Sequence, residues 1–579
     1  MTDNEYKPLD NQTESTAKRK KCIKYGVIAG IVIAVIVIVV VVVVVTKKSS
    51  SDDDLIENEV GDNPYKVSDG SMTKYSFSAK LNGTAQVESR GLRADEDNPI
   101  STELTVSIAH LQRESDSVHI KITDTVKQQY EVDDTIFSRP SVDTTARLEG
   151  LKFGNKSEPF SFSFGQDSNG DPYITTENRD LLVYEKYLEM GFTITSQDIF
   201  GLGKQSDTFK LSDTMYTIFN NGSSTDNSAH PFLLVKHRDN TCSVIGFINS
   251  NAQSIQIRHS SSGKAVVNYY AAGGILEIVM IFKDTMPECI SQYHKFIGLP
   301  ILPPFWALGF GQGSNVLTQE SAAEMIKKYN ESDIPVEVLY LGDSLLEFGS
   351  NFVVNKTAFP DISAFLATEE MKGRKLVPIV DGSVALNDTT NFNKTRDAEA
   401  FIKSVVHEDV ESGTLIGKLR NMSVGYLDWD APGTKAIYEE RLDQLQTDTM
   451  FSGIWLDLNE AYNECDGECP PEKKENDTTS FVGTPKERAP FAFPSEASFN
   501  MNTLSSNATH YDADNTTFRT EYNLHNLFGH QHAQASYSYL NKGDRPFLIS
   551  RSTYTGSGRF TGQFARTEPT WASLKNSVA

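Results

Sequence analysis

The sequence has few basic residues and few cysteines for its length of 579 residues. Lysine and arginine number 54 against 77 aspartates and glutamates, which gives a net charge of −23 at pH 7. This deficit argues against nucleic acid as a main partner, because phosphate binding requires clustered Lys and Arg. Five cysteines are too few for a small disulfide-stapled scaffold. A composition of 39% hydrophobic and 23% charged residues excludes collagen-like and wholly disordered chains, so we expect two or three globular domains.

One stretch, residues 26–45, lacks charges and strong hydrogen-bonding side chains altogether. As a helix rising 1.5 Å per residue, it would span a hydrocarbon core of about 30 Å. A signal peptide would have an apolar region of about 7–15 residues that ends in small residues, which is not the case here. A basic cluster at residues 18–24 precedes the run, and only Lys47 and Lys48 follow it. The positive-inside rule therefore predicts a single-pass type II membrane protein.

In this prediction residues 1–24 form a cytosolic tail, 25–46 a transmembrane helix and 47–74 an acidic stalk. The bulk of the chain is then extracellular or in the secretory or endolysosomal lumen. Eleven Asn-X-Ser/Thr acceptors follow the run, which indicates a glycosylated ectodomain that carries N-glycans. They begin at Asn82, Asn155, Asn221, Asn330, Asn355, Asn387, Asn393, Asn421, Asn476, Asn507 and Asn515.

The ectodomain divides into two patterns. From residue 75 to 300, short alternating stretches such as 117–123 and 275–282 are separated by Gly, Asn, Ser and Asp, which predicts an antiparallel β-sandwich. From 301 to 579, apolar strands alternate with helical segments, which predicts βαβ units and a parallel sheet of the barrel type. The fold class is therefore α+β and multidomain.

Carboxylates follow three of the apolar strands in the second region. Asp343 follows VEVLYLG, Asp381 follows KLVPIV, and Asp457 and Glu460 lie in GIWLDLNE with Trp455 beside them. Paired carboxylates at one barrel mouth suit glycosidic bond cleavage, and an aromatic neighbour suits sugar stacking. For any single aspartate the alternative is a helix cap, and for Trp455 it is core packing.

GIWLDLNE resembles the nucleophile motif of glycoside hydrolase family 31, the α-glucosidases and their relatives. Further segments resemble the family in the same order, namely IFGLGKQ, HPFLLV, GFINSNAQ, LPPFWALGF, YNLHNLFGH and RPFLISRSTYTGSGRFTG. The resemblance implies a β-sandwich leading into a (β/α)8 barrel, and retaining hydrolysis of α-glucosidic bonds in oligosaccharides. It assigns Asp457 as nucleophile with Glu460 in support. It implies substrate binding by Trp455, Arg551, Val384, Asp343 and Phe564, without cofactor or metal.

The chain departs from the family pattern at several of these motifs. The acid/base position is Thr567, which cannot protonate a leaving alkoxide, although the adjacent Glu568 is a candidate substitute acid. Gly342 replaces an aspartate that binds a substrate hydroxyl, and Arg420 replaces a tryptophan. These departures leave open a non-catalytic carbohydrate-binding or partner-binding membrane glycoprotein.

The chain ends at Ala579, before the last barrel strands of the family. We therefore expect an incomplete barrel with open strand edges, in a truncated product or in a chain covered by a partner. Among the cysteines, we expect a disulfide for Cys465 and Cys469, and one between Cys242 and Cys289 is an alternative to free thiols. His525, His530 and His532 match a family segment, which favours a structural role over a metal site.

Overall fold

The structure is a computed structural model. It describes residues 56, 58–72, 76–83, 99–111, 117–136, 139, 142–143, 150–203, 209–220, 228–314, 318–347, 352–405, 413–469, 502–514, 516, 518–564 and 570–578. The predicted tail and transmembrane helix lie outside these residues. Within the described part, no helix combines the length and the apolar character needed to cross a bilayer. Residues 60–258 and 264–579 form one compact unit.

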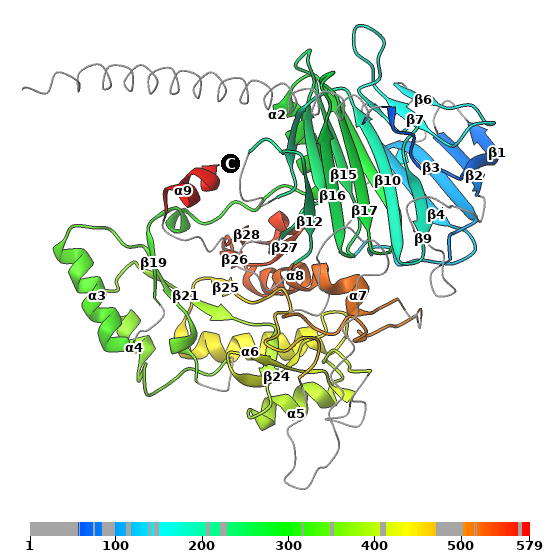
Figure 1. Ribbon diagram of the computed structural model, residues 1–579. Coiled ribbons are helices and arrows are strands. Elements are labelled where there is room, and N and C mark those ends of the chain that lie inside the picture. Colours follow the sequence, from blue (N-terminus) through cyan, green and yellow to red (C-terminus); the bar gives the residue numbers. More distant parts are fainter. Residues whose placement is uncertain are drawn as a thin grey trace, which may run out of the picture. The chain divides into compact units, whose positions relative to one another are not determined.

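Two antiparallel sheets form the N-terminal β-rich region (Figure 1). The first contains, in order, β1 (Lys66–Met72), β2 (Ser76–Asn82), β3 (Glu103–Leu111), β4 (Ser117–Asp124), β18 (Leu276–Lys283), β15 (Cys242–Phe247), β14 (Phe232–Lys236) and β11 (Asp198–Gly201), with β5 (Val142–Asp143) beside β3. The second contains β12 (Thr214–Ile218), β16 (Gln253–His259), β17 (Ala265–Ala271), β10 (Tyr187–Ile194), β8 (Ile174–Thr175), β7 (Phe162–Phe164) and β6 (Leu151–Phe153), with β9 (Leu181–Tyr184) beside β10.

Alternating burial explains how the two sheets share a core. In β2 and β3 every second side chain is buried, as a strand period of two requires. Phe247 of β15 stacks on Tyr269 of β17 with ring centroids 4.0 Å apart, which joins the two sheets. A disulfide between Cys242 and Cys289 ties β15 to helix α2 (Met286–Ile297), so the bridge left open by the sequence is present.

A parallel sheet organises the C-terminal region. Its order is β19 (Gly311–Ser314), β20 (Val338–Leu341), β21 (Lys375–Val380), β25 (Ile454–Leu456), β26 (Leu548–Ser550) and β28 (Gly562–Gln563), and every neighbouring pair is parallel. The helices of this region are α3 (Gln319–Glu331), α4 (Ile362–Leu366), α5 (Thr389–Asp397), α6 (Thr434–Thr449), α7 (Glu521–Leu524), α8 (Phe528–Leu540) and α9 (Trp571–Val578). The predicted alternation of strands and helices is confirmed, whereas a closed barrel is not formed by the strands that the structure describes.

A small antiparallel sheet that we did not predict lies between β21 and α6. It pairs β22 (Ser383–Ala385) with β24 (Met422–Tyr426), which in turn pairs with β23 (Ile416–Leu419). The strands are only three to five residues long, too short for a clear alternation.

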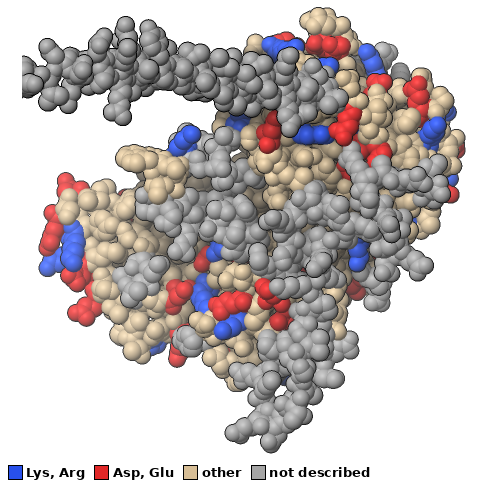
Figure 2. All heavy atoms as spheres, in the orientation of Figure 1, with Lys and Arg blue, Asp and Glu red and all other residues tan. Residues whose placement is uncertain are grey.

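Surface charge in the parallel region is mixed in sign. The outer face of α3 shows acidic and basic side chains side by side (Figure 2). Glu324 and Lys328 of this helix form an i,i+4 ion pair.

Large apolar side chains are exposed before the edge strand β19, among them Phe305 at 88% and Leu308 at 71%. An edge strand with apolar neighbours is a surface that other polypeptides can pair with.

Candidate functional site

Four charged side chains follow successive strands of the parallel sheet. Asp343 follows β20, Asp381 follows β21, Asp457 follows β25 and Arg551 follows β26. Because these strands are parallel, their carboxyl ends share one edge. The structure thus brings the predicted carboxylates together, and Asp343 is the most exposed of them, with 59% of its side chain accessible.

Arg420 is the centre of this group. Its Nε lies 2.6 Å from Asp343 Oδ1 and its Nη2 lies 3.6 Å from Asp457 Oδ2. Its Nη1 also donates a short hydrogen bond to Asp381 Oδ2. One guanidinium therefore contacts three carboxylates at the strand ends.

A tight turn positions Arg420. Arg420 and Asn421 join β23 to β24, and both have positive φ, 49° and 61°. Two consecutive left-handed residues are typical of a two-residue type I′ hairpin. From the sequence alone, Arg420 was identified only as a departure from a family pattern and had no predicted role. The Arg-Asn pair between two short apolar stretches was the signal that could have placed it in a hairpin.

A second ion pair involves the nucleophile candidate. Arg551 lies 3.5 Å from Asp457 Oδ1 and 3.0 Å from Glu460 Oε1. Glu460 is fully buried, while 19% of the Asp457 side chain is accessible. Asp457 thus faces two guanidinium groups. We call Asp343, Asp381, Asp457, Glu460, Arg420 and Arg551 the strand-end cluster.

Burial changes the protonation of two members of this cluster. Burial, followed by the neighbouring charges of Asp457 and Asp343, raises the pKa of Asp381 to about 6 against the opposing effect of Arg420. Burial also raises the pKa of Glu460 to about 7, with Arg551 acting in the opposite direction. Although burial lowers the pKa of Arg420, the three carboxylates, Asp381 foremost, raise it overall. The cluster therefore holds protons close to neutral pH.

Aromatic residues lie next to the cluster. Trp455 is partly buried and its ring centroid lies 5.0 Å from that of Phe564 and 6.4 Å from that of Tyr340. Val384 on β22 is 2% exposed and belongs to the apolar core of the parallel region. Thr567 and Glu568 lie outside the described residues.

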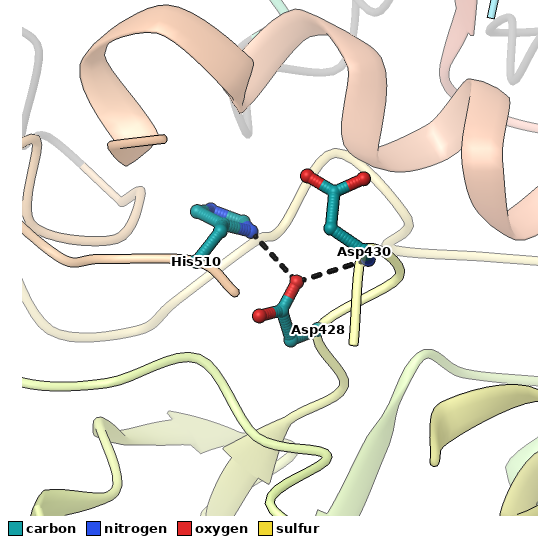
Figure 3. Close-up of side chains that lie close together, drawn as sticks. All are labelled: Asp428, Asp430 and His510. Atoms are coloured by element: carbon teal, nitrogen blue, oxygen red, sulfur yellow. Dashed lines mark hydrogen bonds and ion pairs between the residues drawn. The ribbon is translucent and has the colours of Figure 1, made fainter. Parts of the chain in front are cut away.

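A separate group of buried charges lies in the loops after β24 and before α7. Asp428, Asp430 and His510 place their ligand atoms close enough to hold a metal ion (Figure 3). However, His510 contacts Asp428 through Nδ1 at 3.1 Å and Glu521 through Nε2 at 2.9 Å. Both ring nitrogens face carboxylates, so the imidazole is best described as a cation, which cannot ligate a metal.

The pKa values support this description. Although burial lowers the pKa of His510, Asp428 and Glu521 raise it to about 10. Glu521 also contacts His525 Nδ1 at 2.7 Å, and despite burial these histidines lower its pKa to about 2. Arg519 joins Asp430 at 3.0 Å and Asp133 of the N-terminal region at 2.6 Å. We call Asp428, Asp430, His510, Glu521, His525 and Arg519 the buried histidine network.

The other predicted structural histidines are buried as well. His532 contacts the Tyr438 hydroxyl at 2.9 Å and His530 contacts the Ser557 hydroxyl at 2.8 Å. Burial lowers the pKa of both to about 3, so they are neutral. Cys465 and Cys469, which were expected to form disulfides with partners left open, are bonded to each other in the segment that follows Glu460.

The chain is similar to known proteins. Residues 300–579 match the model of the glycosyl hydrolases family 31 TIM-barrel domain. Lysosomal alpha-glucosidase of Bos taurus is 25% identical over 493 residues, 82% of this chain and 50% of that protein. Alpha-xylosidase 1 of Arabidopsis thaliana is 25% identical over 83% of this chain and 56% of that protein. The chain thus spans about half the length of the curated relatives it matches.

Solved structures share the fold. The glucosidase II alpha subunit in its DNJ-bound form superposes with a TM-score of 0.69 at 17% identity, over 89% of this chain and 60% of that one. A heterodimeric ER glucosidase II complex, of a catalytic subunit and the binding domain of a regulatory subunit, gives a TM-score of 0.70 at 16% identity, over 92% of this chain and 63% of that one.

Proposed function

Because the chain belongs to glycoside hydrolase family 31 through residues 300–579, we propose that it is an α-glucosidase-type glycosidase. It would act on α-glucosidic bonds in oligosaccharides with retention of configuration. The observation that carries this proposal is the position of Asp457, partly accessible at the end of β25 between two guanidinium groups. An ionised carboxylate in this place suits attack on the anomeric carbon, which forms a covalent glycosyl-enzyme that water then hydrolyses.

The remaining residues have proposed roles around Asp457. Glu460, fully buried, supports Asp457 through the shared Arg551. Trp455 and Phe564 would provide an aromatic wall for a glucose ring, with Val384 beneath it and Asp343 for a hydroxyl. Thr567 stands at the acid/base position and cannot protonate the leaving group, so Glu568 would serve as the substitute acid.

A second candidate function is sugar or partner binding without hydrolysis. Arg420 favours it, because its guanidinium ties up Asp343, Asp381 and Asp457 together. A glycoside whose leaving group must be protonated would then react slowly. A glycoside with an activated leaving group, which departs without a proton, would still glycosylate Asp457.

An activated substrate separates the two candidates. With α-glucosyl fluoride, the hydrolase proposal predicts a burst of fluoride followed by slow turnover, and Asp457→Ala should abolish the burst. The matched control is Asp397→Ala, an exposed aspartate outside the cluster, with 69% of its side chain accessible. Absence of a burst in the unaltered chain would favour the non-catalytic function. Maltose turnover comparable to the burst rate would show that Glu568 or another carboxylate serves as acid.

We also propose that residues 26–45 anchor the chain in a membrane as a single-pass type II protein. The relatives with lysosomal names suggest a lumenal or extracellular location for the bulk of the chain.

The two disulfides and the surface position of the acceptor asparagines suit an oxidising, glycosylating compartment. Seven described acceptors are exposed, namely Asn82, Asn155, Asn330, Asn387, Asn393, Asn421 and Asn507, and Asn355 is half-buried. Digestion of the bulk of the chain by protease in intact microsomes would contradict this orientation.

A partner polypeptide over the edge strand β19 completes the proposal. Phe305 and Leu308, 88% and 71% exposed just before β19, are large apolar side chains that a monomer would leave in water. We expect the chain without a partner to aggregate or to bind a chaperone. A monodisperse, cooperatively unfolding chain would count against such a partner.

A further inference from the structure

The hairpin that carries Arg420 packs against the segment that follows Glu460. Three hydrogen bonds join them: the amide of Glu464 donates to the Lys418 carbonyl at 2.9 Å, the amide of Cys469 donates to the Ile416 carbonyl at 2.9 Å, and the amide of Lys418 donates to Asn463 Oδ1 at 2.8 Å. We call residues 463–469 the disulfide loop, because the bond between Cys465 and Cys469 closes it. The loop is thus bonded along β23, the strand that leads into the turn with Arg420.

The disulfide loop is also cross-linked within itself. The buried side chain of Asn463 donates from Nδ2 to the Gly467 carbonyl at 2.9 Å and accepts at Oδ1 from the Cys465 amide at 3.1 Å. The hairpin lies directly against this side chain, since a Cβ atom at Gly417 would lie 2.9 Å from Asn463 Oδ1. The loop therefore gives the hairpin a fixed support.

Glu464 of this loop reaches the turn itself. The Asn421 amide donates to Glu464 Oε1 at 3.1 Å and to Oε2 at 3.3 Å. Both turn residues, Arg420 and Asn421, are left-handed, a region that asparagine tolerates and arginine rarely adopts. Such a conformation persists where the surrounding structure fixes it. The carboxylate of Glu464 fixes this turn, because it binds the amide between the two left-handed residues.

The turn, rather than Asp457, determines where the guanidinium of Arg420 lies. Arg420 Nη2 lies 3.6 Å from Asp457 Oδ2 and forms no hydrogen bond with the described residues. An arginine placed by Asp457 would form a direct hydrogen bond of about 2.7–2.9 Å. The close contacts of Arg420 are instead with Asp343 and Asp381. Its approach to Asp457 is therefore a consequence of the turn and of these two contacts.

We propose that Glu464 is the positioning residue that holds the guanidinium of Arg420 beside Asp457 and so limits the access of a substrate to this carboxylate. Without the Glu464 side chain, the turn would lose its support and Arg420 would withdraw from Asp381 and Asp457. The consequence for a glycosyl substrate rests on the proposed function, whereas the placement of Arg420 by Glu464 does not.

Kinetics of the full chain in detergent provide the first test. In Glu464→Ala, the burst rate with α-glucosyl fluoride should rise about fivefold, the effect of one lost hydrogen bond that held Arg420 in place. A contact that only stabilised the site would lower the rate when removed. Glu464→Gln should restore the rate of the unaltered chain, because its carbonyl oxygen still accepts from the turn amide. The matched control is Glu369→Ala, a glutamate with 85% of its side chain accessible.

The midpoint of urea unfolding provides a second test that needs no catalysis. Arg420 lowers the pKa of Asp381, although burial and the charges of Asp457 and Asp343 keep it at about 6. Withdrawal of Arg420 would raise this pKa further, and a raised carboxyl pKa costs stability as the pH rises. Glu464→Ala should therefore lower the midpoint more at pH 7.5 than at pH 5.5. This excess should disappear when Asp381→Asn is also present.

A faster burst in Glu464→Ala that adds nothing to Arg420→Trp, together with the excess loss at pH 7.5, would support the role of Glu464. A burst that is unchanged or slower in Glu464→Ala would overturn it. A loss of midpoint that is equal at both pH values, or an excess that persists with Asp381→Asn, would overturn it as well. If neither the unaltered chain nor any variant gives a burst, that result counts against the proposed function, and the unfolding midpoints alone decide the role of Glu464.

Discussion

The strand-end cluster and the buried histidine network contain similar groups and hold them in opposite states. In the first, the pKa values of Asp381 and Glu460 are raised to about 6 and about 7. In the second, the pKa of Glu521 is lowered to about 2 and that of His510 is raised to about 10. Both Glu460 and Glu521 are at most 1% exposed, so burial alone does not account for the difference.

The number of partners that each carboxylate contacts explains the difference between the pKa values of Glu521 and Glu460. Glu521 contacts two imidazoles, His510 at 2.9 Å and His525 at 2.7 Å, one on each oxygen. Glu460 has an ion pair with Arg551, which it shares with Asp457, and no hydrogen bond of good geometry among the described residues. A buried carboxylate stays ionised only when its partners compensate for lost hydration. The comparison suggests that one group stabilises the fold and that the other is held ready for a ligand.

The same substitution in both groups should therefore have unequal effects. We expect Glu521→Gln to lower the free energy of unfolding by about 3–5 kcal/mol, because it leaves buried imidazolium without its counter-ion. Glu460→Gln at pH 8 should change it by less than about 1 kcal/mol, since the amide replaces a carboxylate that burial already penalises. Urea unfolding of both variants measures the difference. Equal losses would show that the two groups are energetically alike.

The pH dependence of stability offers a second test. A raised carboxyl pKa in the folded state gives stability that is complete below the unfolded pKa and is lost as pH rises through the folded pKa. For Glu460 this window runs from 4.5 to about 7, and for Asp381 from 3.8 to about 6. The contribution of Glu521 is complete above 4.5 and is lost as pH falls through about 2. That of His510 is complete below 6.5 and is lost as pH rises through about 10.

Between pH 4.5 and 6.5, then, Glu521 and His510 contribute a constant amount. Over the same interval His530 and His532, whose pKa burial lowers to about 3, contribute stability that rises with pH. We therefore expect the free energy of unfolding of Glu460→Gln, relative to that of the unaltered chain, to rise by about 2 kcal/mol from pH 4.5 to 6.5. Unfolding curves at pH 4.5, 5.5 and 6.5 are sufficient. A difference between the two chains that stays constant over the interval would contradict the assignment.

The two groups were also unequally predictable from sequence. Asp343, Asp381 and Asp457 were found because each follows an apolar stretch, and the carboxyl ends of parallel strands meet. The position of Arg420 depends on a turn between two strands too short to detect. Glu521 and His525 of the buried histidine network are an i,i+4 pair, but Asp428 and His510 are joined across loops, where no periodicity links them. Long-range pairing in loops leaves no local signal, so side-chain contacts there had to come from the structure.

Arg420 provides a smaller, kinetic test of the comparison. Arg420→Trp, which restores the residue type expected from the family, should raise the burst rate with α-glucosyl fluoride about tenfold, or about 1.4 kcal/mol. The reason is that Asp457 then has one cation fewer to compete with the substrate. The assay is best run at pH 5.5, where Asp381, with a pKa of about 6, is largely protonated. Removal of the Arg420 guanidinium then leaves no unpaired negative charge on most Asp381 side chains. Arg420→Lys, which keeps the charge, is the control, and an unchanged burst in Arg420→Trp would exclude Arg420 as an obstacle.

The smallest effect is expected outside both groups. Lys394 on α5 lies 2.5 Å from Glu440 on α6, a shorter contact than either of the two that Glu521 forms with histidines, but both side chains are more than half exposed. Water already solvates such a pair, so Lys394→Ala should lower the free energy of unfolding by less than about 0.5 kcal/mol. Raising the salt concentration to 1 M should remove even this difference, because exposed charges are screened over about 3 Å. A loss as large as that in Glu521→Gln would mean that contact distance governs the energetics of these ion pairs. The expected small loss would show instead that burial with complete pairing does.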